Sequence, residues 1–311
     1  MWLTASFAAA LVNIVLSYSY PDNLTSLYPD DANNHMNFTT KCFGDLGCFY
    51  TGPPWYHPLY RPITVPPQEL HTEFLLHTRS NKKKPYHLKP TPESLSKSPF
   101  EENSTLKVFI HGYAENTTVF TSQTGLKAED IHVIGHSVGG QLVGFVGERV
   151  HNLGRITALD PGGPYFDNAP NEVCLDRSDA IFVDVLQTNS GYSAYTGIGE
   201  GPVIGHAVFS INGGRHQPGC DYKPAIKLLG KYNKKTIPNQ CSHLRVLDNF
   251  QSSISTCQYT SYACFSYEGF KAGLCKDTPF TNRMGYHAVK PPYQLNYFLD
   301  TTSKAPYCEP K

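Results

Sequence analysis

The segment from Ile131 to Val150 constrains the fold of this chain most. An apolar run rich in β-branched residues leads into a Gly-x-Ser-x-Gly turn centred on Ser137, and apolar residues at helical spacing follow. The pattern predicts a strand, a tight turn and a helix. It is typical of a nucleophile elbow, in which glycines permit a crowded turn that exposes a serine hydroxyl. The alternative is an ordinary glycine-rich turn in an α/β protein.

Strand-like runs recur along the rest of the chain and alternate with helical or loop segments. This alternation predicts an α/β fold with a mainly parallel sheet. Residues 20–70 are expected to form a loosely wrapped N-terminal segment, and residues 80–104, which are polar and rich in proline, a loop. The predicted strands cover 72–78, 106–111, 131–134, 155–160, 180–188 and 201–212, and the predicted helices run from 138 to 150 and onward from 241.

Length and charge narrow the class of protein. A chain of 311 residues suits one large α/β domain, here placed at residues 71–311. The formal net charge of zero gives no indication of nucleic-acid binding.

The N-terminus carries signals of secretion. Residues 1–19 are predicted to be a signal peptide, because a short apolar run ends near the small residues Ser17 and Ser19. An uncleaved anchor is the alternative, since no basic residue precedes the run; no other segment is suited to crossing a bilayer. An extracellular location is expected, and four N-x-S/T sequons offer glycosylation sites, at Asn23, Asn37, Asn103 and Asn116.

Nine cysteines also indicate a secreted protein. Because no C-x-x-C pair is present, short disulfide loops are expected rather than a structural zinc site. Short segments are bracketed by Cys42 and Cys48, by Cys220 and Cys241, and by Cys264 and Cys275. Cys174, Cys257 and Cys308 remain, and the odd total leaves at least one thiol or an intermolecular partner.

A serine nucleophile needs a base and a carboxylate that orients the base. In an α/β hydrolase the acid follows the serine and the histidine follows the acid. Asp160 is the leading candidate for the acid, because it ends an apolar strand before Pro161. On the residues alone, an aspartate that merely initiates a turn is an equal alternative. The base candidates are His206, His216, His243 and His287, and His243 is favoured because a disulfide at Cys241 could hold it.

The oxyanion of such a reaction needs two backbone amides. Val138 directly follows the nucleophile, and Tyr113 follows the predicted strand that ends at His111. The alternative for His111-Gly112 is a simple strand-ending turn.

Together these motifs resemble the pancreatic lipase family, from about residue 41 to the end. The resemblance is carried by His111-Gly-Tyr113, Gly135-His-Ser-Val-Gly-Gly140, Leu159-Asp-Pro-Gly-Gly-Pro164, Cys241-Ser-His-Leu-Arg245 and Cys42-Phe-Gly-Asp-Leu-Gly-Cys48-Phe49. It implies an α/β-hydrolase fold and a triad of Ser137, Asp160 and His243. It also implies that the oxyanion amides belong to Tyr113 and Val138.

The resemblance further implies a structural calcium ion and a lid, with no cofactor for the chemistry. The calcium ligands would be the carbonyls of Asn171 and Cys174 and the carboxylates of Asp176 and Asp179, oxygen donors of the kind that Ca²⁺ prefers. The lid would be the loop between Cys220 and Cys241, which carries five lysines against one aspartate and a small apolar face. A solvated turn and a solvated surface loop are the respective alternatives.

Two departures from the family stand out. The sequence is expected to lack the family's C-terminal β-sandwich domain, so a colipase-type partner is not expected. Only twenty-three residues, Ala114 to His136, separate Tyr113 from Ser137. A βαβ unit alone takes about 30 residues, so part of the central sheet between Tyr113 and Ile131 is expected to be missing. The strand before Tyr113 must then pair directly with the elbow strand or leave a gap.

The resemblance predicts a secreted serine lipase that hydrolyses acylglycerol esters at a lipid–water interface. The long predicted lid favours triacylglycerol, and phospholipase A1 activity is the alternative. A non-catalytic, lipid-binding homologue is the alternative from another class.

Overall fold

The computed structural model describes residues 9–14, 40–42, 48–50, 52–55, 74–78, 80–81, 83–89, 91–100, 105–110, 127–163, 166, 169–191, 204–220 and 240–308. Several predicted features lie outside the described residues: all four sequons, Tyr113, the expected lid at 221–239 and most of the expected signal peptide.

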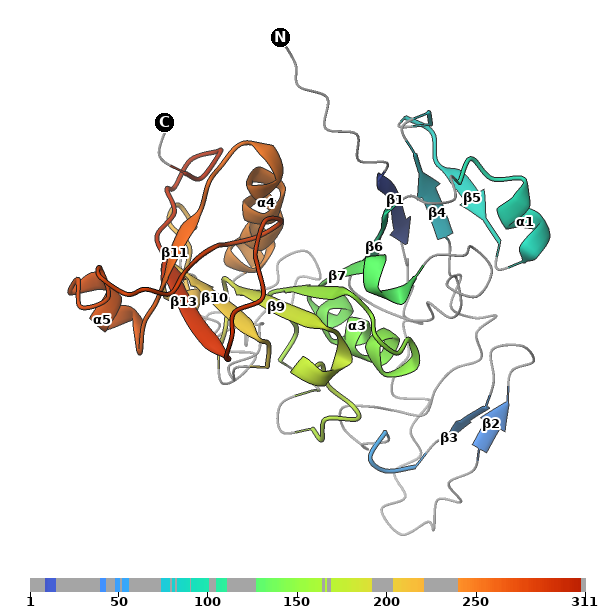
Figure 1. Cartoon of the computed structure of the whole chain (residues 1–311), viewed down its shortest axis with the longest axis horizontal. Coiled ribbons are helices and arrows are strands. Elements are labelled where there is room, and N and C mark those ends of the chain that lie inside the picture. Colours follow the sequence, from blue (N-terminus) through green and yellow to red (C-terminus); the bar gives the residue numbers. More distant parts are fainter. Residues whose placement is uncertain are drawn as a thin grey trace, which may run out of the picture.

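Eleven strands form one sheet in the order β12-β11-β13-β10-β9-β8-β7-β6-β1-β4-β5 (Figure 1). The strands from β13 to β1 in this order run parallel, and antiparallel strands flank them on both edges. The predicted α/β-hydrolase fold is therefore confirmed. The strand bounds are β1 (Ala9–Ile14), β4 (Phe74–His77), β5 (Tyr86–Leu88), β6 (Thr105–Ile110), β7 (His132–His136), β8 (Arg155–Leu159), β9 (Phe182–Gln187), β10 (Ala207–Ile211), β11 (Thr260–Ala263), β12 (Thr281–Arg283) and β13 (Leu295–Leu299).

Few helices flank this sheet in the described part of the chain. The two long ones are α3 (Val138–Arg149) and α4 (Gln240–Ser255), and the short ones are α1 (Pro92–Ser96) and α5 (Tyr267–Lys271). Among the residues that the structure describes, no helix has the length and apolar character needed to span a bilayer. A separate hairpin of β2 (Thr40–Cys42) and β3 (Cys48–Tyr50) lies in the expected N-terminal wrapping segment.

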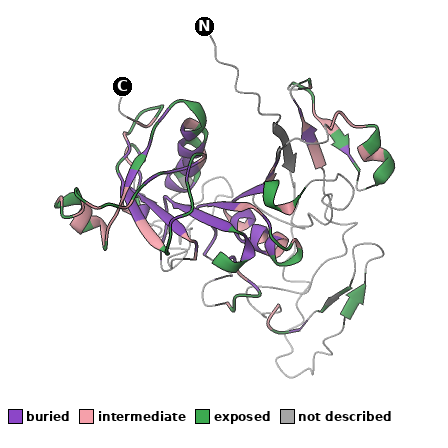
Figure 2. Cartoon of the chain, viewed as in Figure 1, coloured by how far each residue is buried: buried purple, intermediate pink, exposed green. Residues whose placement is uncertain are grey.

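The core occupies both faces of the sheet around β7, β8, β9 and β10, whose residues are almost all buried (Figure 2). Side chains alternate between the faces because successive residues of a strand point in opposite directions. One face gathers Val133, Ile156 and Val183 with Val143 of α3. The other gathers Ile134, Leu159, Leu186 and Phe209 with Val246 and Phe250 of α4. The sheet is thus covered by α3 on one side and α4 on the other.

The pairing of β6, the strand before Tyr113, shows how the sheet accommodates the short connection between Tyr113 and Ser137. β6 pairs directly with β7, in parallel, with Lys107 opposite His132. On its other side β6 pairs in parallel with β1, which is formed by residues 9–14 of the expected signal peptide. β1 also pairs antiparallel with β4. The sheet therefore has no gap beside β6, because the N-terminal apolar segment lies there.

The expected loop at residues 80–104 is wrong in part. This stretch contains β5, which pairs antiparallel with β4, and the short helix α1. The hydroxyl of Thr91 accepts a hydrogen bond from the amide of Ser94, and Pro92 begins the helix. A threonine N-cap followed by proline is a helix-start signal, which the polar, proline-rich composition of the stretch obscures.

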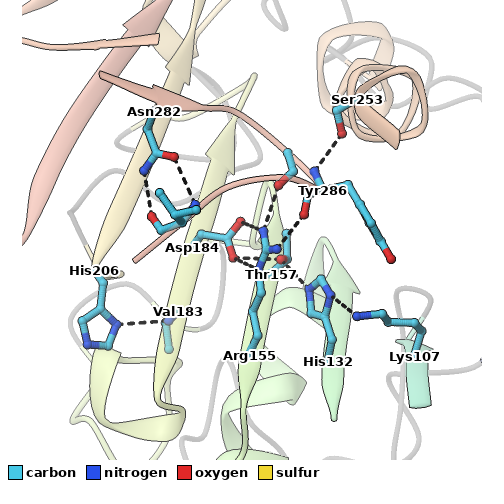
Figure 3. Close-up of polar contacts among 12 residues, drawn as sticks. Lys107, His132, Arg155, Thr157, Val183, Asp184, His206, Ser253, Asn282 and Tyr286 are labelled. Atoms are coloured by element: carbon cyan, nitrogen blue, oxygen red, sulfur yellow. Dashed lines mark hydrogen bonds and ion pairs between the residues drawn. The ribbon is translucent and has the colours of Figure 1, made fainter. Parts of the chain in front are cut away.

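A buried polar network ties the C-terminal part of the chain to the sheet (Figure 3). The guanidinium of Arg155 in β8 donates to both carboxylate oxygens of Asp184 in β9, at 2.8 and 2.9 Å. The same guanidinium donates to the carbonyls of Gly285 and Tyr286, which follow β12. Asp184 also accepts from the hydroxyl of Thr157 at 2.9 Å. This network fixes the segment after β12 over the middle of the sheet.

The three bracketed cysteine pairs are disulfide-bonded in the structure: Cys42–Cys48, Cys220–Cys241 and Cys264–Cys275. A fourth disulfide joins Cys257 to Cys308. Cys174 keeps its thiol, whose sulfur lies 3.1 Å from the carbonyl oxygen of Ala169.

Candidate active site

Ser137 lies in the sharp turn between β7 and α3. Its backbone has φ 58° and ψ −126°, a conformation that L-residues adopt only when the surroundings impose it. Its amide donates to the carbonyl of Leu159 at 3.0 Å, and its own carbonyl accepts from Gly140 and Gly162, each at 2.9 Å. A Cβ on Gly135 would lie 2.1 Å from the carbonyl oxygen of Gly139, so only glycine fits before this turn. The predicted elbow has the backbone that its sequence pattern requires.

Asp160 follows β8 at the carboxyl edge of the parallel strands. It is fully buried, with φ 45°, and its amide donates to the carbonyl of Leu186. Its Oδ1 accepts from the backbone amides of Thr188 at 2.8 Å and Asn189 at 2.9 Å. Two amide donors hold the carboxylate in a fixed orientation and offset the cost of burying it.

His243 lies near the start of α4 and completes the pairing with this carboxylate. Its Nδ1 lies 2.5 Å from Oδ2 of Asp160, and the residue is 6% exposed. Because Nδ1 faces the acid, the opposite nitrogen, Nε2, is turned toward the rest of the site. Nε2 is buried and has no hydrogen-bond partner among the described residues. An imidazole oriented in this way can accept a proton at Nε2.

The elbow and the acid–base pair lie next to one another. The ring of His136, which precedes Ser137, lies 4.7 Å from the ring of His243, and its Nε2 is 3.4 Å from the carbonyl oxygen of His243. The bond from Ser137 to Leu159 brings the turn against the residue before Asp160. No hydrogen bond joins Ser137 Oγ to His243 Nε2 in the described structure. Such contacts are often long in unliganded enzymes.

The other candidate histidines lie elsewhere. Nδ1 of His206 accepts from the amide of Val183 at 3.0 Å, and burial lowers the pKa of this imidazole below its usual value. His216 is exposed. Nε2 of His287 is bonded to the carbonyl of Ile254 at 2.9 Å. Of the four candidates, the structure brings His243 to Asp160.

The amide of Val138 begins α3, directly after Ser137. The first amides of a helix have no partner within the helix and can donate to a developing negative charge. Tyr113, the other expected donor, lies outside the described residues.

Two of the expected calcium residues, Asp176 and Asp179, lie in a short helical turn beside α3, and Asn171 and Cys174 precede it. Asp176 Oδ1 caps this turn by accepting from the amide of Ser178, and Oδ2 of Asp179 accepts from the amide of Asp176 at 2.8 Å. The carbonyl of Asn171 accepts from the amide of Cys174 at 3.3 Å. Burial raises the pKa of Asp179 to about 7, and the charges of Asp176 and Glu148 raise it as well. Within the described ranges, no three His, Cys, Asp or Glu side chains converge as a metal-binding group.

The residues that hold the acid, Thr188 and Asn189, carry no motif in the sequence. Thr188 and Asn189 reach Asp160 because β9 lies beside β8 in the sheet, and both strands end at the same edge. Their position along the chain could have indicated them. Residues that directly follow one parallel strand lie beside the residue that ends the neighbouring strand.

Known proteins similar in sequence to this chain belong to one family. A model of the family described as Lipase matches residues 114–307. Pancreatic lipase-related protein 2 of Rattus norvegicus is 30% identical over 310 residues, which cover 79% of this chain and 66% of that protein. Pancreatic lipase-related protein 3 of Homo sapiens is 40% identical over 192 residues, covering 57% of this chain and 41% of that protein. The inactive pancreatic lipase-related protein 1 of Mus musculus is 28% identical over 327 residues, covering 85% and 68%.

The parallel sheet and the serine turn after β7 define an α/β hydrolase. The matches to the Lipase family and to these relatives then identify the chain as a member of the pancreatic lipase family. The chain spans slightly less than two thirds of the rat protein's length, at 66%.

Proposed function

We propose that the chain is a secreted serine lipase that hydrolyses acylglycerol esters at a lipid–water interface. The observation that carries the proposal is the buried pair of His243 and Asp160, which are 2.5 Å apart with two further amides on the carboxylate. The strained backbone of Ser137 beside this pair gives additional support. Membership of the family supports ester hydrolysis as the class of reaction.

In the proposed reaction, Nε2 of His243 takes the proton of Ser137 Oγ as that oxygen attacks the ester carbonyl. Asp160 stays ionised and keeps Nδ1 of the imidazole in place. The oxyanion accepts from the amides of Val138 and Tyr113. When the tetrahedral intermediate collapses, the alcohol leaves with the proton from His243. A water molecule, deprotonated by His243, then attacks the acyl-enzyme. The bond to Ser137 Oγ breaks, this oxygen takes the proton back from His243, and the fatty acid is released.

The proposal includes an extracellular location and an interfacial lid. Four disulfides in the described structure suit an oxidising compartment. The segment between Cys220 and Cys241 would act as a basic, partly apolar lid that opens on an anionic lipid surface. No colipase-type partner is needed in this scheme.

We also propose that Ca²⁺ stabilises the turn at Asp176 and Asp179, with the carbonyls of Asn171 and Cys174 as the other ligands. The carboxylates suit a cation, because burial and nearby negative charge raise the pKa of Asp179 to about 7. A bound Ca²⁺ would offset this charge and would supply no step of the chemistry. Thermal unfolding in calcium and in chelator tests the proposal, since Asp179→Asn should abolish any stabilisation by calcium.

A fluorophosphonate probe and two substrates test the proposed function. The probe should label the folded chain, and Ser137→Ala should prevent labelling. Emulsified triglyceride should be hydrolysed faster than phosphatidylcholine vesicles. The opposite preference would favour a phospholipase A1, and labelling without turnover of either lipid would contradict the proposed substrate class.

A catalytically defunct, lipid-binding homologue is the second candidate. It is favoured by the short connection of twenty-three residues between Tyr113 and Ser137, and by a similar mouse protein whose name states that it is inactive. Failure of the folded chain to react with the probe, together with binding to lipid vesicles, would support this candidate.

A further inference from the structure

Gln217 is a fully buried amide between β10 and Cys220. Its side chain makes three hydrogen bonds, so its conformation is fixed. Nε2 donates to the carbonyls of Thr188 at 3.0 Å and Ile211 at 2.8 Å. Oε1 accepts from Nδ2 of Asn212 at 2.8 Å. A side chain with every polar atom occupied in this way forms a rigid bridge between the backbone segments it touches.

One end of this bridge reaches the acid. The carbonyl that Gln217 holds belongs to Thr188, and the amide of Thr188 donates to Oδ1 of Asp160 at 2.8 Å. The same carbonyl shares a planar peptide group with the amide of Asn189, which also donates to Oδ1 of Asp160, at 2.9 Å. A rotation of this peptide group would move that amide, so Gln217 restrains the loop after β9 at a peptide group that contacts Asp160.

The other end of the bridge reaches the base. The backbone amide of Gln217 donates to Oγ of Ser242 at 3.1 Å, and Ser242 directly precedes His243 in α4. Ser242 is itself 2% exposed, so this bond is shielded from water. The next residue repeats the link to α4, because the carbonyl of Pro218 accepts from Arg245 at 2.9 Å.

We infer that Gln217 is a positioning residue for the acid–base pair, because it ties the loop that orients Asp160 to the helix turn that carries His243. It does not touch the reacting atoms and acts through Thr188 and Ser242. This inference rests on the proposed function for its catalytic consequence, but the geometric coupling can be measured without any substrate.

The experiment compares Gln217→Met with Asn282→Ala. The methionine has similar length and cannot donate to Thr188 or Ile211. Asn282 is a matched control (Figure 3), since it is a buried amide that bonds the carbonyl and amide of Val289, and neither of these belongs to the acid loop or α4. Gln217→Asn, which keeps the donors on a shorter stem, is the second variant if the methionine variant does not fold.

Two readouts are taken on the full chain. With ¹⁵N-labelled histidine, the Nδ1–H resonance of His243 is assigned by its loss in His243→Gln and reports the bond to Asp160. Steady-state ester hydrolysis gives kcat and KM. We expect Gln217→Met to shift or broaden the resonance and to lower kcat by up to about tenfold without changing KM, as for a small displacement of catalytic groups. Asn282→Ala should lower the unfolding temperature and leave both readouts unchanged.

The outcomes separate the two proposals. An unchanged His243 resonance in a folded Gln217→Met or Gln217→Asn variant would overturn the inference, whether or not the chain hydrolyses esters. A His243 resonance that differs between Gln217→Met and the wild type, together with no hydrolysis by the wild type, would support the inference and contradict the proposed function. A change of the same size in Asn282→Ala would mean that the effect is general to buried amides, which would also overturn the inference.

Discussion

At the scale of single residues, Arg155 and Asp184 form a buried ion pair between neighbouring strands. The side chains are 16% and 0% exposed, and the carboxylate also holds the hydroxyl of Thr157. Replacing Asp184 by alanine would leave the guanidinium without its charged partner in a site that water hardly reaches. We expect Asp184→Ala to lower the free energy of unfolding by roughly 3–5 kcal/mol, measured by equilibrium urea denaturation.

An exposed ion pair provides the control for this prediction. Lys97 and Glu93 are 2.6 Å apart, but their side chains are 67% and 76% exposed. Water screens such pairs, so Glu93→Ala should cost less than about 1 kcal/mol. Equal losses in the free energy of unfolding would show that burial does not determine how strongly an ion pair stabilises this chain.

His132 makes stability depend on pH. Burial lowers its pKa well below 6.5, and the charges of Arg155 and Lys107 lower it further. Between this lowered pKa and 6.5, the unfolded chain binds a proton that the folded chain does not bind. Stability is therefore lost as the pH falls below 6.5 and is not affected by this group above it.

Replacing His132 by asparagine removes this titration. We expect the free energy of unfolding of His132→Asn to fall less steeply than that of the wild type below pH 6.5, by up to about 1.4 kcal/mol per pH unit. Denaturation curves of both proteins between neutral and mildly acidic pH provide the measurement. Parallel pH dependences would show that another group dominates.

The candidate site could be predicted from the sequence as far as its reactive groups. The glycines around Ser137 predict that it is a nucleophile. Asp160 and His243 are predicted by the motifs that carry the resemblance. Gln217 and Thr188 carry no such local pattern. Their roles arise from strand neighbours and from loops that meet only when β9, β10 and α4 are packed.

At the scale of elements, the β7–turn–α3 unit depends on close backbone approach at Gly135. A methyl group there would overlap the carbonyl of Gly139 at 2.1 Å. The carbonyl of Gly139 is part of the backbone, so the overlap cannot be relieved by a side-chain rotation. We expect Gly135→Ala to destabilise the protein by about 3 kcal/mol or more and to abolish labelling of Ser137, checked by denaturation and by the fluorophosphonate probe.

Gly269 in α5 is the comparison for that substitution. An added Cβ there would meet its nearest atoms at 3.5 Å, an ordinary contact. Since alanine favours a helix over glycine, Gly269→Ala should be neutral or stabilise by up to about 1 kcal/mol. A similar loss at both glycines would argue against a specific clash at the elbow.

The elements themselves differ in how well the sequence predicts them. Fully buried runs such as those of β7 and β9 stand out, because each contains adjacent apolar residues, Val133-Ile134 in one and Phe182-Val183 with Val185-Leu186 in the other. The short elements β5 and α1 have few residues in which a period can be recognised, and the polar composition of residues 80–104 obscures them. The place of β1 in the sheet depends on a contact with β6, far along the chain, that no local pattern encodes.

At the scale of the whole molecule, β1 joins two parts of the sheet. β6 pairs with it on one side and β4 on the other, and the β4–β5 hairpin reaches the remaining strands through it. Removing residues 1–19 would take this strand away. We expect the shortened chain to have a lower unfolding temperature and to aggregate, because the edge of β6 would be left unpaired.

Thermal unfolding and light scattering of the full and shortened chains check this prediction. The N-terminal sequence of the protein recovered from an expressing culture shows which form is produced. A shortened chain as stable and monodisperse as the full one would mean that β6 does not require β1.

The pairing of His243 with Asp160 joins positions 83 residues apart in the sequence. While the chain is being synthesised, Ser137 and Asp160 emerge well before the imidazole that would activate them. Under the proposed mechanism, a nascent chain threaded through a membrane is harmless to the surrounding lipids until α4 has docked beside β8. The ability to cleave an ester would thus arise only when α4 has packed in its place.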